Sequence, residues 1–266
     1  MTAQHMSSPE ASRPTADGSR DSDVSSGEVA VDPTPAYADF LARMAHDLRS
    51  PLGIVLETVG RLERELSSHF TDDHKLFLRL GNRGLLRLHA FVDRITLLAE
   101  LEKGHLEPSK VELDLRDVVK SAVDATTRAE PRREVTVVNE PFDDVCGIVG
   151  DPLLLKQAVA EIVRNAVAHA RKTVRVAVAS SNGIAMVSVE DDGEGVRPGV
   201  EGTLFQRFVQ RPSRSGLGIG LSIAMDVARV HGGGIEPGQS SLPAGRPGTV
   251  GARFTLSLPA IAPPPA

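Results

Sequence analysis

His46 lies directly before Asp47 and five residues before Pro51 in the segment 44–52. The flanking apolar residues recur at alternating spacings of four and three, which is typical of a helix packed in a bundle or coiled coil. In that register the histidine and the aspartate lie off the apolar seam and face solvent or a partner. Pro51 offers no N–H to the carbonyl of Asp47, so a kink is expected where a second domain could approach the imidazole. Taken alone, the pattern is more typical of an ordinary surface histidine on an amphipathic helix.

Glu161 and Asn165 are four residues apart in a segment with helical periodicity, so they share one helix face. A carboxylate and an amide oxygen placed in this way can hold a hydrated Mg²⁺, which prefers oxygen ligands. A solvated pair on a helix surface is the alternative interpretation.

Asp191 directly follows a predicted buried strand and precedes Gly193 and Gly195. Its carboxylate can point into a cleft and accept a hydrogen bond from an exocyclic amine. The two glycines let the backbone approach a planar ring closely or adopt positive φ. An acidic turn that contains glycines is the alternative.

A second glycine-rich segment, Gly216-Leu217-Gly218-Ile219-Gly220-Leu221, opens a predicted helix. Backbone N–H groups at such a helix end can face phosphates. No Gly-Lys-Ser/Thr follows and no βαβ unit precedes, which disfavours a Walker loop and a dinucleotide fold. Just before this segment, Phe205 and Phe208 could anchor a lid, and Arg211 and Arg214 could meet phosphate. A solvated loop is the alternative.

Two sets of elements must position these groups. Long helices at about 38–66 and 74–103, joined by a short loop, predict a helical hairpin. Its apolar stripe is wider than one partner helix can cover, so we expect two copies to pair as a four-helix bundle. Beyond residue 104 the pattern becomes mixed, with helices at about 115–128, 153–170 and 216–230, and strands at about 134–138, 173–179, 184–190 and 251–258.

The fold class expected is therefore two domains: an all-α dimerisation hairpin followed by an α+β sandwich. The turn at 181–183 makes the strands on either side antiparallel, with helices on one sheet face. We expect a disordered tail over 1–36, the hairpin over 37–104, the second domain over 105–260 and a loose tail over 261–266.

Bulk composition excludes several classes. The 266 residues carry a net charge of −5, which offers no basic footprint for nucleic acid. The single cysteine, Cys146, excludes an internal disulfide and fits a reducing compartment. Neither an apolar run long enough for a membrane span nor a signal-peptide pattern is found, so a soluble, cytoplasmic protein is expected.

These segments, in this order and spacing, resemble the sequence boxes of bacterial two-component sensor histidine kinases. His46–Leu52 resembles the H box, Gly150–Ala166 the N box with its lead-in, and Asp191–Gly195 the first glycine box. Leu204–Phe208 resembles the F box, and Gly216–Leu221 the second glycine box, followed by His231-Gly232-Gly233. The resemblance covers about residues 38–260.

The resemblance implies a protein-histidine kinase that uses ATP and Mg²⁺. His46 would accept the phosphoryl group, and Asp47 would orient the imidazole and take its proton. Asn165, assisted by Glu161, would hold the metal, and Asp191 would bind the adenine amine. The residues expected to close over the nucleotide are Gly193, Gly195, Phe208, Gly216, Gly218, Gly220 and Leu221.

The resemblance also implies partners: a second copy of the chain, and a separate response-regulator receiver domain whose aspartate takes the phosphoryl group. Since no sensor domain precedes the hairpin in this sequence, an upstream sensory protein is a further expected partner. Ser50 stands where the family often has Thr or Asn, which leaves phosphatase activity open. Two alternatives remain: a signalling scaffold that has lost catalysis, and a gyrase-type ATPase, whose activating glutamate Glu161 also matches.

Overall fold

The computed structural model describes residues 35–104, 106–129, 135–140, 145–197, 199–209, 218–243 and 248–261. All of them belong to one compact unit that begins at Pro33. Of the two tails expected from the sequence, residues 1–34 and 262–266 lie outside the described residues.

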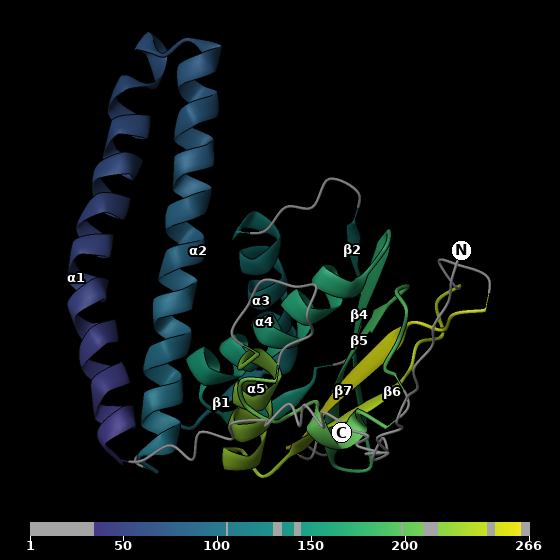
Figure 1. The fold of residues 1–266 in the computed structure, drawn as a ribbon. Helices are drawn as coiled ribbons and strands as arrows, with labels where there is room; N and C mark the ends of the chain where they lie inside the picture. Colours follow the sequence, from purple (N-terminus) through teal and green to yellow (C-terminus); the bar gives the residue numbers. More distant parts are fainter. Residues whose placement is uncertain are drawn as a thin grey trace, which may run out of the picture. The chain divides into compact units, whose positions relative to one another are not determined.

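The predicted hairpin consists of α1 (Pro35–Leu66), the short 3₁₀ turn η1 (Ser67–His69) and α2 (Asp72–Glu102), which run side by side (Figure 1). α1 begins three residues before the predicted start and continues through Pro51. α2 begins two residues early because Thr71 caps it: the Thr71 hydroxyl accepts the His74 N–H at 3.3 Å. Ala45, Leu52 and Val92 are buried together between the helices.

The rest of the described chain is an α/β domain (Figure 1). Its helices are α3 (Leu115–Ala129), α4 (Pro152–His169) and α5 (Gly220–Val230), with the 3₁₀ turn η2 (Glu201–Thr203). Its strands are β1 (Val111–Asp114), β2 (Thr136–Asn139), β3 (Gly147–Gly150), β4 (Thr173–Ser181), β5 (Ile184–Asp191), β6 (Gly234–Gln239) and β7 (Ala252–Pro259).

The main sheet has the strand order β2-β4-β5-β7-β6, and β1 pairs with β3 in a separate two-stranded sheet. β4 and β5 are antiparallel around Asn182 and Gly183, both at positive φ, as the predicted turn requires. β2, in contrast, pairs with β4 in parallel, so the sheet is mixed. β1, β3 and β6 had no counterpart among the predicted strands.

The core is aliphatic because the chain contains few aromatic residues. α3 and α5 both pack against α4, and the three helices lie along one face of the main sheet (Figure 1). Along β5, Ala185, Val187 and Val189 are fully buried, which is the period-two pattern of a strand with one covered face. Phe254 of β7 is the largest fully buried side chain among the described residues.

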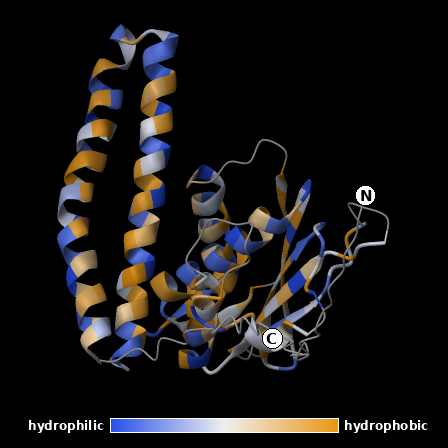
Figure 2. Ribbon diagram, viewed as in Figure 1, coloured by the Kyte–Doolittle hydropathy of each residue, from blue (hydrophilic) through white to orange (hydrophobic). Residues whose placement is uncertain are grey.

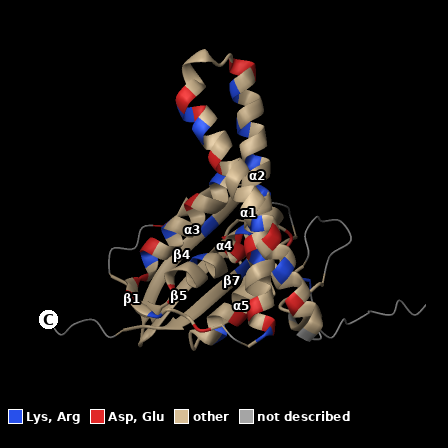
Figure 3. Ribbon diagram, turned by 90° about the vertical axis from the view of Figure 1, so that its left-hand side faces the viewer, with Lys and Arg blue, Asp and Glu red and all other residues tan. Residues whose placement is uncertain are grey.

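Hydrophobic residues run along the whole length of both hairpin helices (Figure 2). Basic and acidic residues are interspersed along the same helices (Figure 3), in keeping with the lack of a basic footprint in the sequence. Within the described part of the chain, no helix has both the length and the apolar character needed to cross a bilayer.

A candidate nucleotide site and an exposed histidine

The helix that carries Glu161 and Asn165 is fixed at its start by Asp151. The Asp151 Oδ1 accepts the N–H groups of Leu153 and Leu154, at 2.9 and 3.1 Å. Pro152 occupies the first helical position, where its missing N–H costs nothing. The cap sets the register of α4 and thereby the face on which the two candidate metal residues lie.

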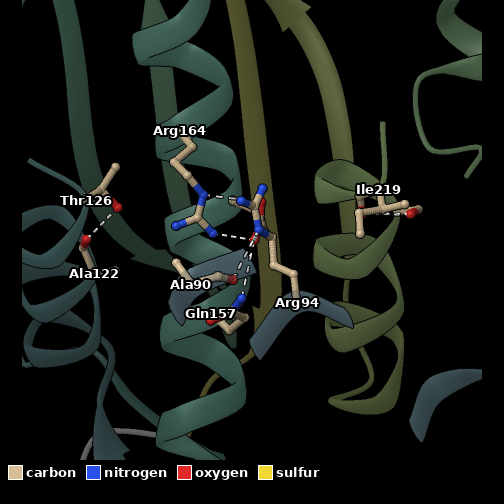
Figure 4. A network of polar contacts seen from close by, with 9 residues as sticks. Ala90, Arg94, Ala122, Thr126, Gln157, Arg164 and Ile219 are labelled. Atoms are coloured by element: carbon tan, nitrogen blue, oxygen red, sulfur yellow. Dashed lines mark hydrogen bonds and ion pairs between the residues drawn. The ribbon is translucent and has the colours of Figure 1, made fainter. Parts of the chain in front are cut away.

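Glu161 is buried, with only 3% of its surface exposed. Three side chains with N–H groups lie around its carboxylate: Arg94, Gln157 and Arg164, which are labelled in Figure 4. Arg164, one turn along α4, forms an ion pair with it, and the Gln157 amide donates to Oε1 at 3.3 Å. Arg94 of α2 adds a second guanidinium, with Nε 3.7 Å from Oε1. Asn165 is half-buried on the same helix.

The two candidate residues on this helix therefore differ in how well they suit Mg²⁺. Among the described residues no group of three His, Cys, Asp or Glu side chains could hold a metal by itself. Mg²⁺ commonly takes one or two protein oxygens and completes its shell with water and substrate phosphates, which the Asn165 amide oxygen suits. Glu161 is also an oxygen ligand, but in this arrangement two arginines neutralise it.

Asp191 closes β5 and is 1% exposed. Its Oδ1 accepts the N–H groups of Gly193 and Ala252, at 2.9 and 3.3 Å. These bonds fold the chain sharply after β5 and fix the carboxylate against the start of β7. Gly251 makes this possible, since a Cβ there would lie 1.7 Å from the Asp191 carbonyl oxygen. Sequence reasoning had not singled out Gly251.

The acidic residues on either side of Asp191 are structural anchors. Asp192 accepts the N–H groups of Arg171 and Lys172, at 2.8 and 3.0 Å. Burial by itself would raise the pKa of Asp192, but the backbone donors outweigh it and the pKa is lowered. The pKa of Glu190 is lowered in the same way: burial opposes the shift, and the Ser241 N–H and Arg175 produce it.

The predicted glycines stand where the backbone admits no side chain. A Cβ on Gly193 would lie 2.4 Å from the carbonyl oxygen of His169, at the end of α4. Gly195, at φ +73°, and Gly218, at φ +67°, would place a Cβ 2.2 Å from Val250 O and 2.4 Å from Val209 O. Gly216 lies outside the described residues.

The start of α5 brings three of the predicted segments together. A Cβ on Gly220 would lie 2.6 Å from Glu161 Oε2, so the second glycine box rests on the N-box helix. The Phe208 N–H donates to the Gly218 carbonyl at 3.0 Å, which ties the F box to the same helix end. Leu221 is partly buried against the core.

His46 and Asp47 are both exposed on α1. Among the described residues, neither side chain takes part in a hydrogen bond or an ion pair. The imidazole is open to solvent, as the heptad register predicts.

Residues 150–262 match the family described as histidine kinase-, DNA gyrase B-, and HSP90-like ATPase. Strands β4 to β7 and helices α4 and α5 all lie within these residues, so they form an ATPase domain of that class.

Over a longer stretch the chain is similar to complete sensor kinases. The sensor-type histidine kinase PrrB of Mycobacterium tuberculosis is 33% identical over 229 residues, 83% of this chain and 47% of the relative. The signal transduction histidine-protein kinase AfsQ2 of Streptomyces coelicolor is 30% identical over 240 residues, 85% of this chain and 42% of the relative. Most of the chain is thus similar to bacterial sensor histidine kinases. The chain spans less than half the length of these two relatives.

Solved structures share the fold. Full-length ShkA in complex with AMPPNP has a TM-score of 0.61 at 23% identity, covering 84% of this chain and 46% of that one. The histidine kinase AdeS of Acinetobacter baumannii has a TM-score of 0.51 at 20% identity, covering 80% of this chain and 97% of that one.

Proposed function

We propose that this chain is a protein-histidine kinase that transfers the γ-phosphoryl group of Mg-ATP to His46. The observation that carries the proposal is the exposed His46–Asp47 pair on a helical hairpin in the same chain as an ATPase-class domain. The similarity to PrrB supports it, because that similarity extends over 83% of the chain and is not confined to the ATPase domain.

In the proposed site, Asp191 accepts a hydrogen bond from the adenine amine, and Gly193 and Gly195 leave room for the ring. Backbone N–H groups of Gly216, Gly218, Gly220 and Leu221 face the phosphates, and Phe208 belongs to the segment that closes over them. The AMPPNP complex of ShkA, a structural neighbour, is consistent with a nucleotide site in this fold.

Asn165 holds the metal in this proposal, and Glu161 assists when its arginine partners release it. The metal neutralises charge on the phosphates during transfer. In the gyrase-type alternative Glu161 would activate water, which would likewise require its two guanidinium partners to release it.

An imidazole nitrogen of His46 attacks the γ-phosphorus in line with the bond to ADP. The N–P bond forms as the P–O bond breaks, ADP leaves, and Asp47 takes the ring proton. Catalysis rests mainly on positioning, because the transition state has little covalent chemistry for the protein to perform. The phosphoryl group then passes to an aspartate of a receiver domain on a separate response regulator.

The chain acts as a homodimer in this proposal. Large apolar side chains remain exposed along both hairpin helices, among them Phe40, Ile54, Val55, Leu62, Leu76, Phe77, Leu80 and Leu88. A row of this length marks an interaction surface, and a second copy placed as a four-helix bundle would cover it.

The deciding experiment incubates the chain with γ-labelled ATP and Mg²⁺ and compares it with His46→Ala. We expect a label that is lost in acid, persists in base and is absent from the variant. His69→Ala, which removes an exposed histidine from the same hairpin, should label normally. Label that survives in His46→Ala would reject His46 as the acceptor.

Two other results point to the rival functions. ATP binding without any label would favour the signalling scaffold. Release of inorganic phosphate that does not depend on His46 would favour a gyrase-type ATPase.

A further inference from the structure

A largely buried guanidinium lies beside the proposed phosphate end of the nucleotide site. The glycine-rich segment 216–221, whose N–H groups would face the phosphates, contains no Lys or Arg. On α4 the only Lys and Arg residues are Lys156 and Arg164, and Arg164 directly precedes Asn165. The phosphates of Mg-ATP keep a net negative charge, which a cation from the protein stabilises through charge-assisted hydrogen bonds. Arg164 is therefore a candidate for that cation.

Arg164 reaches the start of α5 through Glu161. The two side chains form an ion pair on α4, and only 14% of the Arg164 side chain is exposed (Figure 4). The same carboxylate faces Gly220, where a Cβ would lie 2.6 Å from Oε2. Gly220 is the first residue of α5 and belongs to the segment proposed to face the phosphates. The guanidinium thus lies close to that segment, on the helix that carries Asn165.

The Glu161 carboxylate occupies only one edge of the Arg164 guanidinium. Nε donates to Oε2 at 3.4 Å, and Nη2 donates to Oε1. Nη1 donates to no acceptor within the part of the chain that the structure describes. An arginine presents five N–H donors in a rigid planar fork, a shape that matches carboxylate and phosphate oxygens. Its outer edge is therefore available to a second anion.

The charges around Glu161 do not balance. Arg94 of α2 places a second guanidinium beside the same carboxylate, with Nε 3.7 Å from Oε1. Both arginine side chains are less than a quarter exposed, and among the described residues neither has another carboxylate partner. Two largely buried positive charges thus face one negative charge. An anion bound at this place would offset the surplus, since partly buried charges are screened weakly by solvent.

We infer that Arg164 is a phosphate-binding residue of the nucleotide site, which holds Glu161 with one edge of its guanidinium and a phosphate oxygen with the other. The inference rests on the proposed function and adds a residue to its site. The adenine end lies at Asp191, so Arg164 contributes to the affinity for nucleotides and not to that for a nucleoside without phosphates. A phosphate on the outer edge also weakens the attraction between Arg164 and Glu161, which favours the release that the proposed metal role of Glu161 requires.

The test compares ligands with and without phosphates on the full chain. Arg164→Gln removes the charge, whereas Arg164→Lys keeps the charge and lacks the fork. The control is Arg128→Gln, which changes an exposed arginine on α3. Calorimetry measures the affinity for AMPPNP, once with Mg²⁺ and once with EDTA, and NMR titration measures the weaker affinity for adenosine. Thermal unfolding verifies that each variant is folded, and Arg94 and Gln157 remain as partners of Glu161 in both.

Arg164→Gln should bind AMPPNP about 10- to 150-fold more weakly, as expected for the loss of a hydrogen bond to a charged group. Its affinity for adenosine should equal that of the native chain. The loss for AMPPNP should persist in EDTA, because the guanidinium contacts the phosphates directly. Arg164→Lys should bind AMPPNP at least about threefold more weakly, since a single ammonium cannot hold Glu161 and a phosphate in the same geometry. Arg128→Gln should match the native chain with both ligands.

Three results would overturn the inference. Equal losses for AMPPNP and adenosine would show that Arg164 supports the fold of the site and not the phosphates. A loss that appears only with Mg²⁺ would show that Arg164 acts through the metal, and an unchanged affinity of both Arg164 variants would show that no contact forms. In each of these cases a native chain that binds AMPPNP leaves the proposed function standing, whereas a native chain that binds none removes both.

Discussion

His231 Nε2 accepts a hydrogen bond from the backbone N–H of Asp151 across 2.9 Å, although the two residues are 80 apart in sequence. The accepting nitrogen is unprotonated, so the proton is on Nδ1, which donates to the Val227 carbonyl at 2.8 Å. Asp151 caps α4, and His231 ends α5. One buried imidazole thus fixes the N-box helix relative to the helix that begins with the second glycine box.

His231→Leu should destabilise the α/β domain by about 1–3 kcal/mol, because it leaves the Asp151 N–H without its acceptor and removes one of the two donors to the Val227 carbonyl. His231→Gln should recover part of the loss, since its side-chain amide offers both an acceptor and a donor. Urea unfolding of the full chain, followed by circular dichroism, measures both variants. Equal stability of His231→Leu and the native chain would show that the His231 hydrogen bonds do not stabilise the fold.

Asp191→Asn should weaken ATP binding by about 10- to 150-fold, the value of a hydrogen bond to a charged acceptor of about 1.5–3 kcal/mol. The fold should survive, since the amide oxygen can still accept the Gly193 and Ala252 N–H groups. Calorimetric titration with ATP and with GTP provides the test. GTP has a carbonyl where adenine has its amine, so the native preference for ATP should shrink in the variant.

The control for this prediction is Asp124→Asn, which changes an exposed aspartate on α3 and should leave both affinities unchanged. A full ATP preference retained by Asp191→Asn would mean that another group binds the adenine edge.

Asp192 should make the domain sensitive to acid. Because its folded-state pKa lies below the ordinary value of about 3.9, it contributes stability above that pH and loses it as the pH falls through the lowered pKa. Asp192→Asn should therefore cost about 1–3 kcal/mol at pH 7 and flatten the fall in stability below about pH 4. Urea midpoints from pH 2.5 to pH 7, a range chosen to bracket the transition, measure it.

The pKa of Glu190 is also lowered, so Glu190 loses its contribution to stability over the same acid range. Glu190 is unchanged in the variant. The difference between the variant and the native chain therefore gives the contribution of Asp192 to the pH dependence of stability. A variant whose stability falls as steeply in acid as that of the native chain would contradict the assignment.

Local signals predicted the elements that have distinctive ends. Asp151 and Pro152 marked the start of α4, and the Asn182–Gly183 turn marked the β4–β5 hairpin. The missed strands β1 and β3 are only four residues long, and β6 contains two glycines and a proline. Such strands form through pairing with distant segments and not through their own propensity. The parallel pairing of β2 is likewise a property of the assembled sheet.

The same reasoning applies to the candidate site. Residue type and spacing predicted Asp191 and the glycines. Glycine is favoured wherever the backbone has positive φ, and this depends on the local chain and not on distant contacts. They could not reveal that Gly251 approaches the Asp191 backbone, nor that Gly220 lies over Glu161. Least predictable was Arg94, which lies 67 residues before Glu161 and reaches it only because α2 packs against the domain.

Val55→Asp combined with Leu62→Asp should convert the proposed dimer to monomers. Both residues belong to the apolar series of α1 that recurs at spacings of four and three, which runs Leu48, Leu52, Val55, Val59, Leu62. Both are more than 40% exposed in the single chain. Fully burying such a side chain is worth about 1.5–3 kcal/mol. Because less than half of each side chain is exposed in the single chain, the dimer gains roughly 0.6–1.3 kcal/mol from each of the four copies. Their loss should therefore raise the dissociation constant at least about fiftyfold. Unpaired aspartates in an apolar seam add a further penalty.

Sedimentation equilibrium of the native chain and the double variant measures this directly, with Glu63→Gln as a control, since Glu63 is exposed on the same helix off the seam. The double variant should still bind Mg-AMPPNP as tightly as the native chain, because its substitutions lie on the hairpin and the proposed nucleotide site lies in the α/β domain. A double variant that sediments as the native dimer would place the interface on another face. Lost nucleotide binding in a folded monomer would show that the partner copy helps to build the site.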